Sequence, residues 1–128
     1  MLSFSDFTAR TTISIPLGIP EVEVHHVEQN ERGDYIVTVE SKQQGTVCQH
    51  CGRSITKSNG VGRWIQLRHL PILGHRLYIR LRPKQYKCAH CNDKLTTQRL
   101  GWYESKSPHT KAYDQHLMLQ LATHHFHK

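Results

Sequence analysis

Two pairs of cysteines are the residues with the clearest chemistry in this sequence. Cys48 and Cys51 form one Cys-x-x-Cys pair, Cys88 and Cys91 form a second, and together they are all four cysteines of the chain. Two intervening residues let both sulfurs of a tight turn point at one ion, and two such turns supply the four ligands of a tetrahedral site. Four thiolates leave no open coordination position, so the spacing predicts one structural zinc ion.

The sequences around the two pairs resemble each other. Residues 48–56 read CQHCGRSIT and residues 88–96 read CAHCNDKLT. Two matching knuckles joined by β structure are typical of a zinc ribbon. His50 and His90 stand between the cysteines and are candidates to replace a thiol, but the chelate geometry places them outside the ring, and we expect them to be exposed.

Three other uses of the cysteines remain open at this point. Rubredoxin-like iron would share the ligand pattern. A redox Cys-x-x-Cys normally opens a helix in a βαβ unit, which neither pair does. Disulfides need an oxidising compartment, whereas the N-terminus has no basic start followed by an apolar core, and this favours a reducing one.

Basic and aromatic residues are interleaved between the two cysteine pairs. The aromatic residues are Trp64, Tyr78 and Tyr86, and such a mixture on a β surface suits phosphate contacts combined with stacking or groove packing. The alternative is a solvated hairpin face whose aromatic rings cover the edge of a core. The candidate DNA-binding residues are Arg63, Arg68, Arg76, Arg80, Arg82, Lys84 and Lys87.

Charge is unevenly distributed along the 128 residues, whose formal net charge is +7. Residues 1–47 hold seven acidic and three basic side chains, and residues 48–128 hold three acidic and fourteen basic ones. The second half therefore suits a polyanion, although a basic balance also serves solubility. Its acids, Asp93, Glu104 and Asp114, are too dispersed to hold two catalytic metal ions, so we predict no catalytic residue.

The elements that position these residues are mainly strands. Alternating apolar residues predict a β-hairpin within residues 21–47, with turn residues at 30–33. A second hairpin is predicted from the runs 63–70 and 76–82 around the turn Pro71-Ile72-Leu73-Gly74. Its later strand places apolar residues on one face and arginines on the other. No stretch approaches the ~20 apolar residues of a membrane span.

The C-terminal part of the sequence predicts a helix. Ser107 as N-cap and Pro108 at the first helical position predict its start, and the pattern continues to about Phe126. Apolar residues recur every four positions at Tyr113, Leu117 and Leu121, and such a stripe is usually a packing surface. The fold class is therefore α+β and β-rich: a β-hairpin followed by a four-cysteine zinc ribbon and a C-terminal helix. The expected segments are an extended N-terminal part (1–20), the β-hairpin (21–47), the zinc ribbon (48–107) and the helix (108–128).

Four motifs follow one another along the chain: C-x-x-C-G at 48–52, the segment Leu67-Arg68-His69-Leu70-Pro71, Gly74 followed by alternating Leu, Ile and Arg, and Tyr86-Lys87-Cys88-x-x-Cys91. Their order resembles the N-terminal zinc-finger domain of bacterial insertion-sequence transposases of the ISL-three family. With the upstream hairpin and the terminal helix, the resemblance covers about residues 17–123. In the second knuckle Asn92-Asp93-Lys94 replaces the more common Gly-Arg/Lys-like turn.

This resemblance implies a DNA-binding portion of a transposase that recognises the terminal inverted repeats of an insertion element. Family members continue into a helix-turn-helix region, whose start residues 108–128 resemble, and then into an RNase H-like catalytic domain. We expect this chain to lack the catalytic domain and not to be an enzyme. The expected partners are double-stranded DNA and, through self-association, another copy or a full-length transposase, with no membrane.

The location that the resemblance implies is the bacterial cytoplasm, in association with the nucleoid. Two rival functions remain open. One is a zinc-ribbon module for protein interaction or oligomerisation, acting through the helix that carries Leu117 and Leu121. The other is metal-assisted nuclease action. Salt-sensitive binding to duplex DNA would favour DNA recognition over the interaction module.

Overall fold

The computed structural model describes residues 17–126, with side chains up to Ala122. Most of the predicted N-terminal segment, residues 1–16, lies outside the described residues. The described part of the chain contains nine strands, one short 3-10 helix and one α-helix. Within this part of the chain, the prediction of a β-rich α+β fold with a four-cysteine ribbon and a C-terminal helix is confirmed.

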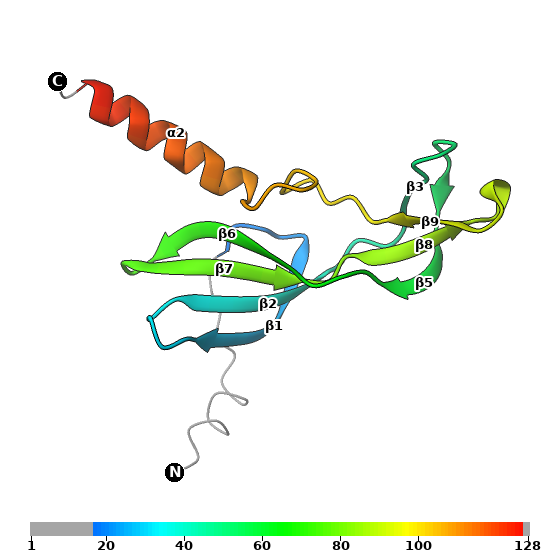
Figure 1. The fold of residues 1–128 in the computed structure, drawn as a ribbon, viewed down its shortest axis with the longest axis horizontal. Helices are drawn as coiled ribbons and strands as arrows, with labels where there is room; N and C mark the ends of the chain where they lie inside the picture. Colours follow the sequence, from blue (N-terminus) through cyan, green and yellow to red (C-terminus); the bar gives the residue numbers. More distant parts are fainter. Residues whose placement is uncertain (1–16, 127–128) are drawn as a thin grey trace, which may run out of the picture.

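The larger sheet combines the two predicted hairpins. Its strands are β1 (Val22–Gln29), β2 (Tyr35–Ser41), β7 (His75–Leu81) and β6 (Ile65–Ile72), in that spatial order (Figure 1). The β1–β2 and β6–β7 pairs are antiparallel, and β2 pairs with β7 in parallel. The predicted segments 21–47 and 48–107 therefore share this sheet, because both hairpins have an apolar face to bury.

One face of this sheet forms the main core. Val37 and Ile79 are completely buried at adjacent positions of β2 and β7. The segments around Leu17 and Trp102 cover this face, whereas the opposite, more open face carries half-buried and exposed side chains. The buried residues of the core are Leu17, Val22, Val37, Val39, Leu67, Leu77, Ile79, Leu81, Leu100 and Trp102.

The remaining strands form the ribbon at the other end of the molecule (Figure 1). A two-stranded sheet pairs β3 with β4, and a three-stranded sheet has the order β5-β8-β9. A short 3-10 helix, η1, follows β8 directly. The bounds are Thr46–Val47 for β3, Ser54–Ile55 for β4, Lys57–Val61 for β5, Lys84–Cys88 for β8, Ala89–Cys91 for η1 and Lys94–Thr97 for β9.

The helix α2 (Lys111–Phe126) begins later than its predicted start at residue 108. Thr110 caps it, because its Oγ1 accepts a hydrogen bond from the backbone N–H of Tyr113 at 3.1 Å. The predicted cap at Ser107 is wrong. The hydroxyl of Ser107 instead accepts a hydrogen bond from the backbone N–H of His109 at 3.1 Å.

Residues 108–110 start no helix because they lie extended along the edge of β6. The backbone N–H of Arg68 donates to the Pro108 carbonyl at 2.8 Å, and the N–H of Thr110 donates to the Arg68 carbonyl at 3.0 Å. The neighbouring His69 is buried and touches two further segments: its Nε2 lies 2.7 Å from the Leu17 carbonyl and its Nδ1 lies 2.8 Å from Thr110 Oγ1.

These two contacts determine which ring nitrogen of His69 carries the proton. A carbonyl only accepts, so Nε2 carries the proton donated to Leu17, and Nδ1 accepts the proton of the Thr110 hydroxyl. Burial lowers the pKa of His69 and so favours this neutral ring. One side chain thereby joins β6, the first described segment and the cap of α2.

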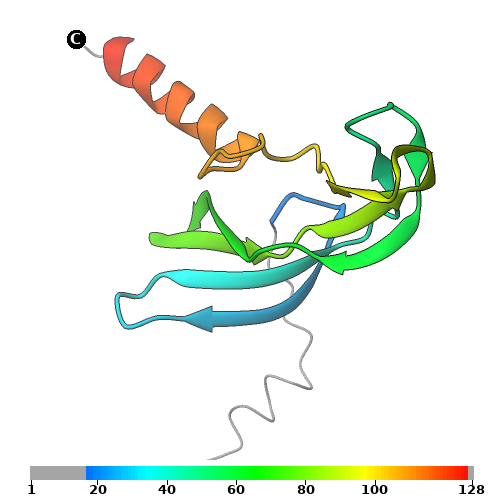
Figure 2. The ribbon, with the colours of Figure 1, turned by 45° about the vertical axis from the view of Figure 1, so that its right-hand side comes forward.

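The helix leaves the sheet at the edge of β6 and extends away from the ribbon (Figure 2). Tyr113 and Leu117 are half-buried, but Met118 and Leu119 are each 69% exposed and Leu121 is 68% exposed. The predicted packing stripe therefore covers only the first turns of the helix, and that prediction is wrong for Leu121. Between residues 17 and 126, no helix has the length and apolar character needed to cross a membrane.

Candidate metal centre and nucleic-acid interface

The cysteine pairs occupy the turns of two small hairpins. In the first knuckle, between β3 and β4, the backbone N–H of Cys48 donates to the Arg53 carbonyl at 2.8 Å, and the N–H of Gly52 donates to the Cys48 carbonyl at 2.9 Å. In the second, between β8 and β9, the N–H of Asp93 donates to the Cys88 carbonyl at 2.9 Å. These bonds curl each turn so that its two sulfurs point inward.

Each knuckle needs a left-handed residue directly after its second cysteine. Gly52 has φ +78° and Asn92 has φ +55° at equivalent positions. Glycine adopts this conformation without a Cβ penalty, and asparagine is among the residues that tolerate it best. The departure of the second knuckle from a glycine turn is thus compatible with the same backbone path. Asp93, at φ +58°, is also left-handed.

The four sulfurs converge on one point. The Sγ atoms of Cys48 and Cys91 lie 3.8 Å apart, those of Cys51 and Cys88 lie 3.6 Å apart, and all four lie within 4.8 Å of one another. Sulfurs bound at about 2.3 Å to one tetrahedral zinc are about 3.8 Å from each other. The spacing suits a shared ion and is far longer than the S–S bond of about 2.05 Å in a disulfide.

The thiols of the site differ in proton affinity. Burial raises the pKa of Cys91 to about 12, the neighbouring thiols adding to the effect, and burial also raises the pKa of Cys88. Burial acts in the same direction on Cys48, but hydrogen bonds from the backbone N–H groups of His50 and Cys51 help lower its pKa to about 6. Cys48 therefore loses its proton more readily than Cys88 and Cys91, and a divalent ion displaces thiol protons as it binds.

The two histidines of the knuckles lie outside this cluster. Nε2 of His90 is 3.4 Å from a guanidinium nitrogen of Arg53, and Nε2 of His50 is 3.5 Å from the amide nitrogen of Gln49. Both rings are exposed. The sulfur set is therefore complete without them, with four cysteines positioned for one structural zinc ion.

A second group of possible ligands is brought together on β1 and β2. Glu23, His25 and Glu40 place ligand atoms within 4.8 Å of one another, and all three are exposed. Nε2 of His25 lies 3.2 Å from a carboxylate oxygen of each glutamate, as an ion pair would place it. With the cysteine cluster, this is the only such group among residues 17–122, whose side chains the structure describes.

Of the predicted DNA-binding residues, the structure gathers four on the open face of the larger sheet. Arg68 on β6 is directly opposite Tyr78 on β7, and Arg80 follows two positions along. The alternation of β7 places Arg76 on this face as well, and Arg82, one residue past the end of β7, lies beside the Trp64 ring. We call this surface the arginine face; it comprises Arg68, Arg76, Arg80 and Arg82 with the rings of Trp64 and Tyr78.

Aromatic rings hold several of these guanidinium groups in place. The guanidinium carbons of Arg80 and Arg82 lie 4.4 Å and 5.3 Å from the Trp64 ring centroid. That of Arg68 lies 4.9 Å from the Tyr113 ring and 5.7 Å from the Tyr78 ring. Such cation–π contacts restrict the side chains. Nε of Arg82 also donates to the Gly62 carbonyl at 3.1 Å and Nε of Arg68 is buried, so the terminal nitrogens of these groups are the ones that can bind oxygen atoms.

Tyr113 is a residue of this surface that the sequence did not indicate. Its four-residue spacing placed it in the apolar stripe of the helix, whereas its ring stacks on Arg68. The contact depends on residues 108–110 lying along β6, which brings the first turn of α2 beside that strand. No local pattern carries this non-local pairing, so only the basic and aromatic composition of the region could have suggested it.

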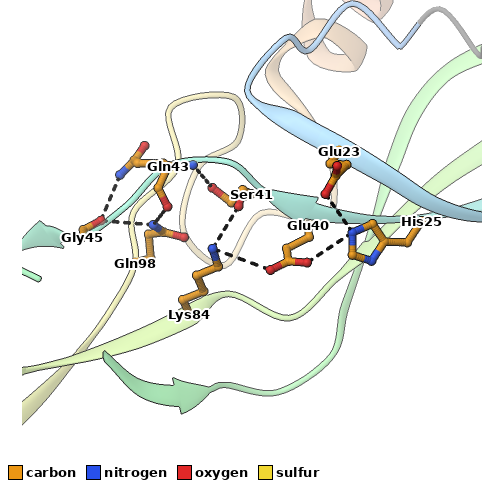
Figure 3. A network of polar contacts seen from close by, with 8 residues as sticks. All are labelled: Glu23, His25, Glu40, Ser41, Gln43, Gly45, Lys84 and Gln98. Carbon is orange, nitrogen blue, oxygen red and sulfur yellow. Dashed lines mark hydrogen bonds and ion pairs between the residues drawn. The ribbon is translucent and has the colours of Figure 1, made fainter. Parts of the chain in front are cut away.

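The other three predicted cations lie elsewhere. Nζ of Lys84 donates to the Ser41 carbonyl at 3.1 Å and lies 3.7 Å from Glu40, so it joins β8 to the end of β2 (Figure 3). Lys87 lies on β8 opposite Lys57, in the ribbon. Arg63 is exposed in the connection before β6. Lys84 thus has a structural role, and the predicted set forms no single surface.

Figure 3 shows the polar junction between the two parts of the molecule. The side chain of Gln98, after β9, donates to the carbonyls of Gln43 and Gly45 at 2.9 Å and 3.1 Å. The Lys84 contacts continue the network to Glu40, which in turn pairs with His25 on β1. The ribbon and the larger sheet are therefore joined here mainly by hydrogen bonds and ion pairs.

A hollow of about 590 Å³ lies between the ribbon and the segment that leads to α2. Its lining includes Gln49, Ile65, Tyr103 and the cations Arg99 and Lys106. The carboxylate that lines it, Glu104, pairs with Lys111 at 3.4 Å. This arrangement lacks the several carboxylates that a two-metal nuclease requires.

Comparison with known families agrees with this geometry. The family model described as the zinc-finger of transposase IS204/IS1001/IS1096/IS1165 matches residues 44–91. The matched segment contains all four cysteines and the whole β6–β7 hairpin. The resemblance inferred from the sequence is thereby confirmed over these residues, and the cysteine cluster is a zinc site of this type. No curated protein and no solved structure matches the chain.

Proposed function

Because residues 44–91 carry the zinc ribbon of an insertion-sequence transposase, we propose that this chain binds duplex DNA and recognises the terminal inverted repeats of an insertion element. The observation that carries the proposal is the arginine face, where Arg68, Arg80 and Arg82 are stacked on aromatic rings. Guanidinium groups held in this way lose less side-chain freedom when they bind phosphate.

The charge around the arginine face limits where DNA can lie. Glu23 and Glu28 on β1 and Glu40 on β2 are exposed on the same face, over its β1–β2 half. Phosphates are repelled there and attracted over β6 and β7. The proposed footprint is therefore the β6–β7 hairpin with the start of α2, and the β1 edge lies outside it.

The proposed role is recognition without strand cleavage or transfer. The zinc ribbon is a non-catalytic domain, since four thiolates fill the coordination sphere of its ion. The carboxylates of the basic half, Asp93, Glu104 and Asp114, come together in no metal-binding group among the described residues. Catalysis in this proposal belongs to a full-length transposase acting with this chain at the bacterial nucleoid.

Selection of bound sequences from random duplex DNA tests the proposal directly. We expect enrichment of one sequence class, and an unselected pool after several rounds would contradict sequence recognition. Salt dependence then locates the surface. Arg76→Gln with Arg80→Gln should reduce the magnitude of the slope of log affinity against log salt by about 1.8, at roughly 0.9 for each phosphate that the variant no longer neutralises.

A matched control is available in the acidic half of the chain. Arg32→Gln with Lys42→Gln removes the same charge from two exposed positions outside the β6–β7 hairpin. This control should leave the slope nearly unchanged. If the folded Arg76/Arg80 variant binds duplex DNA with unaltered affinity and slope, the arginine face is only a solvated surface.

The exposed apolar end of α2 supports a second candidate function, association with another protein chain. Met118, Leu119 and Leu121 lie in the later turns of α2, and all three are exposed. Sedimentation of the zinc-loaded protein over a range of concentrations separates the two candidates. Concentration-dependent self-association with no affinity for DNA would favour the interaction module.

A further inference from the structure

The tip of the β6–β7 hairpin has an unusual residue for its backbone conformation. Ile72 pairs with His75, so Leu73 and Gly74 form a two-residue turn. Their φ angles are +49° and +79°, both in the left-handed region. A turn with two such residues favours Asn-Gly, because the Cβ of most other residues meets a steric penalty at the first position.

Packing within the chain does not compensate for this penalty. Leu73 is 87% exposed, which makes it the most exposed large apolar side chain among the described residues. Its neighbour His75, in contrast, has its ring edge-on to Tyr35 with centroids 5.4 Å apart. The leucine therefore gains neither burial nor a favourable backbone in this molecule, and strain of this kind is often associated with function.

The position of Leu73 indicates what could bury it. It is at the end of the hairpin that carries the arginine face, and the exposed Arg76 follows it closely on β7. Proteins that hold DNA by its phosphates often insert an apolar side chain between base steps in the minor groove and kink the duplex. The geometry points to Leu73 as such a wedge, entering the minor groove while the arginine face holds the backbone. This inference rests on the proposed function.

A bending experiment tests the wedge. The probe is a duplex of about 30 base pairs with fluorophores at both ends and a central TA step, since pyrimidine–purine steps kink easily. Energy transfer reports bending, and anisotropy reports affinity. The zinc-loaded wild-type protein should bring the ends closer, and more so than on a duplex with a stiff A-tract in the same place.

Leu73→Asn is the decisive variant because it suits the turn and removes the apolar group. We expect it to lose bending, to bind about tenfold more weakly, and to keep the wild-type salt slope, because an apolar contact releases no counterions. Its melting temperature should equal or exceed that of the wild type. Leu73→Met should keep the bending. The matched control is Val47→Gln, at another exposed apolar side chain, on β3, and it should change neither quantity.

Two results would overturn the wedge. One is that Leu73→Asn bends the duplex as much as the wild type does. If the Arg76/Arg80 variant has lost affinity in the same assays, this result leaves the proposed function intact. The other is a lower melting temperature of Leu73→Asn at unchanged zinc content, which would show that the leucine serves the fold. Absence of duplex binding by the wild type would instead reject the proposed function and the wedge together.

Discussion

The larger sheet buries ten residues in one apolar cluster, whereas the buried cluster of the ribbon consists of Ile55, Tyr86 and the zinc ligands Cys48 and Cys88. Burial of apolar area can stabilise the sheet in the ordinary way. The ribbon has too few apolar side chains for this, so its stability must come from the ion that its thiols share. One chain thus combines two sources of folding free energy, joined by the polar junction around Lys84 and Gln98.

Loss of zinc gives the largest expected effect and tests most directly whether the ribbon and the larger sheet are stabilised in different ways. Cys88→Ser should abolish stoichiometric zinc binding and unfold the ribbon, since structural zinc contributes about 10–16 kcal/mol in small zinc domains. Amide hydrogen exchange should show loss of protection in β8 and β9 with protection retained in β2 and β7. Elemental analysis should find one zinc per chain in the wild type.

The control for this experiment is His50→Ala, which removes a knuckle histidine outside the sulfur cluster. It should alter neither zinc content nor protection. Full metal and a protected ribbon in both Cys48→Ser and Cys88→Ser would contradict the four-cysteine site. Simultaneous unfolding of both sheets in Cys88→Ser would show that the larger sheet depends on the ribbon.

A substitution that creates a cavity in the core of the larger sheet should have the converse effect: it should weaken the sheet and leave the ribbon and its zinc site unchanged. Ile79 is completely buried on β7, so Ile79→Ala should lower the free energy of unfolding by about 2–5 kcal/mol. Zinc affinity should remain within a few fold of the wild-type value, because the side chain is not part of the ribbon cluster. Urea unfolding and chelator competition measure the two quantities. A large loss of zinc affinity would mean that the two regions fold as one unit.

The sequence predicted the ribbon better than the arrangement of the sheet. Cysteine spacing defines the metal site because two short turns contain all its ligands, and strand alternation defines each hairpin locally. The parallel pairing of β2 with β7 joins residues far apart in the sequence, and no local pattern encodes it. The hairpins could be predicted singly, whereas their union in one sheet could not.

The same limit explains the wrong helix start and the unexpected position of Lys84. Ser107 and Pro108 are a good helix start by local rules, but pairing of residues 108–110 with β6 delays the helix to Lys111. Lys84 looked like its neighbours in the sequence, yet its ammonium group binds the end of β2. In each case a contact with a distant strand decides the outcome.

Acid should affect the two regions through different groups. In the sheet, burial lowers the pKa of His69 from 6.5, so the unfolded chain takes up the proton first as the pH falls below 6.5. The contribution of His69 to stability is therefore complete above pH 6.5 and decreases as the pH falls toward its lowered folded-state pKa. In the ribbon, acid instead protonates the thiolates and releases zinc.

His69→Phe separates these two responses. It should cost about 1–3 kcal/mol at neutral pH, because the Leu17 carbonyl and the Thr110 hydroxyl lose their partner. It should also reduce the difference in unfolding free energy between about pH 7.5 and about pH 5.5. The pH dependence of zinc release should not change. An identical pH dependence of unfolding in the variant and the wild type would show that another group carries the acid sensitivity of the sheet.

The smallest expected effect compares the two knuckles themselves. Asn92 and Gly52 hold equivalent left-handed positions, and a Cβ at Gly52 would meet no atom within 4 Å. Asn92→Gly should therefore be nearly neutral, whereas Asn92→Ala should destabilise the ribbon by about 1 kcal/mol, because alanine lacks the local hydrogen bonding that lets asparagine adopt positive φ. Because metal binding is coupled to folding, a loss of about 1 kcal/mol corresponds to roughly fivefold weaker zinc binding, which chelator competition measures.

Gly52→Ala should show a similar loss of zinc affinity, since backbone conformation and not space limits that position. Equal zinc affinity in the wild type and Asn92→Ala would mean that the second knuckle binds its ion without the left-handed turn, and the two knuckles would then not be equivalent.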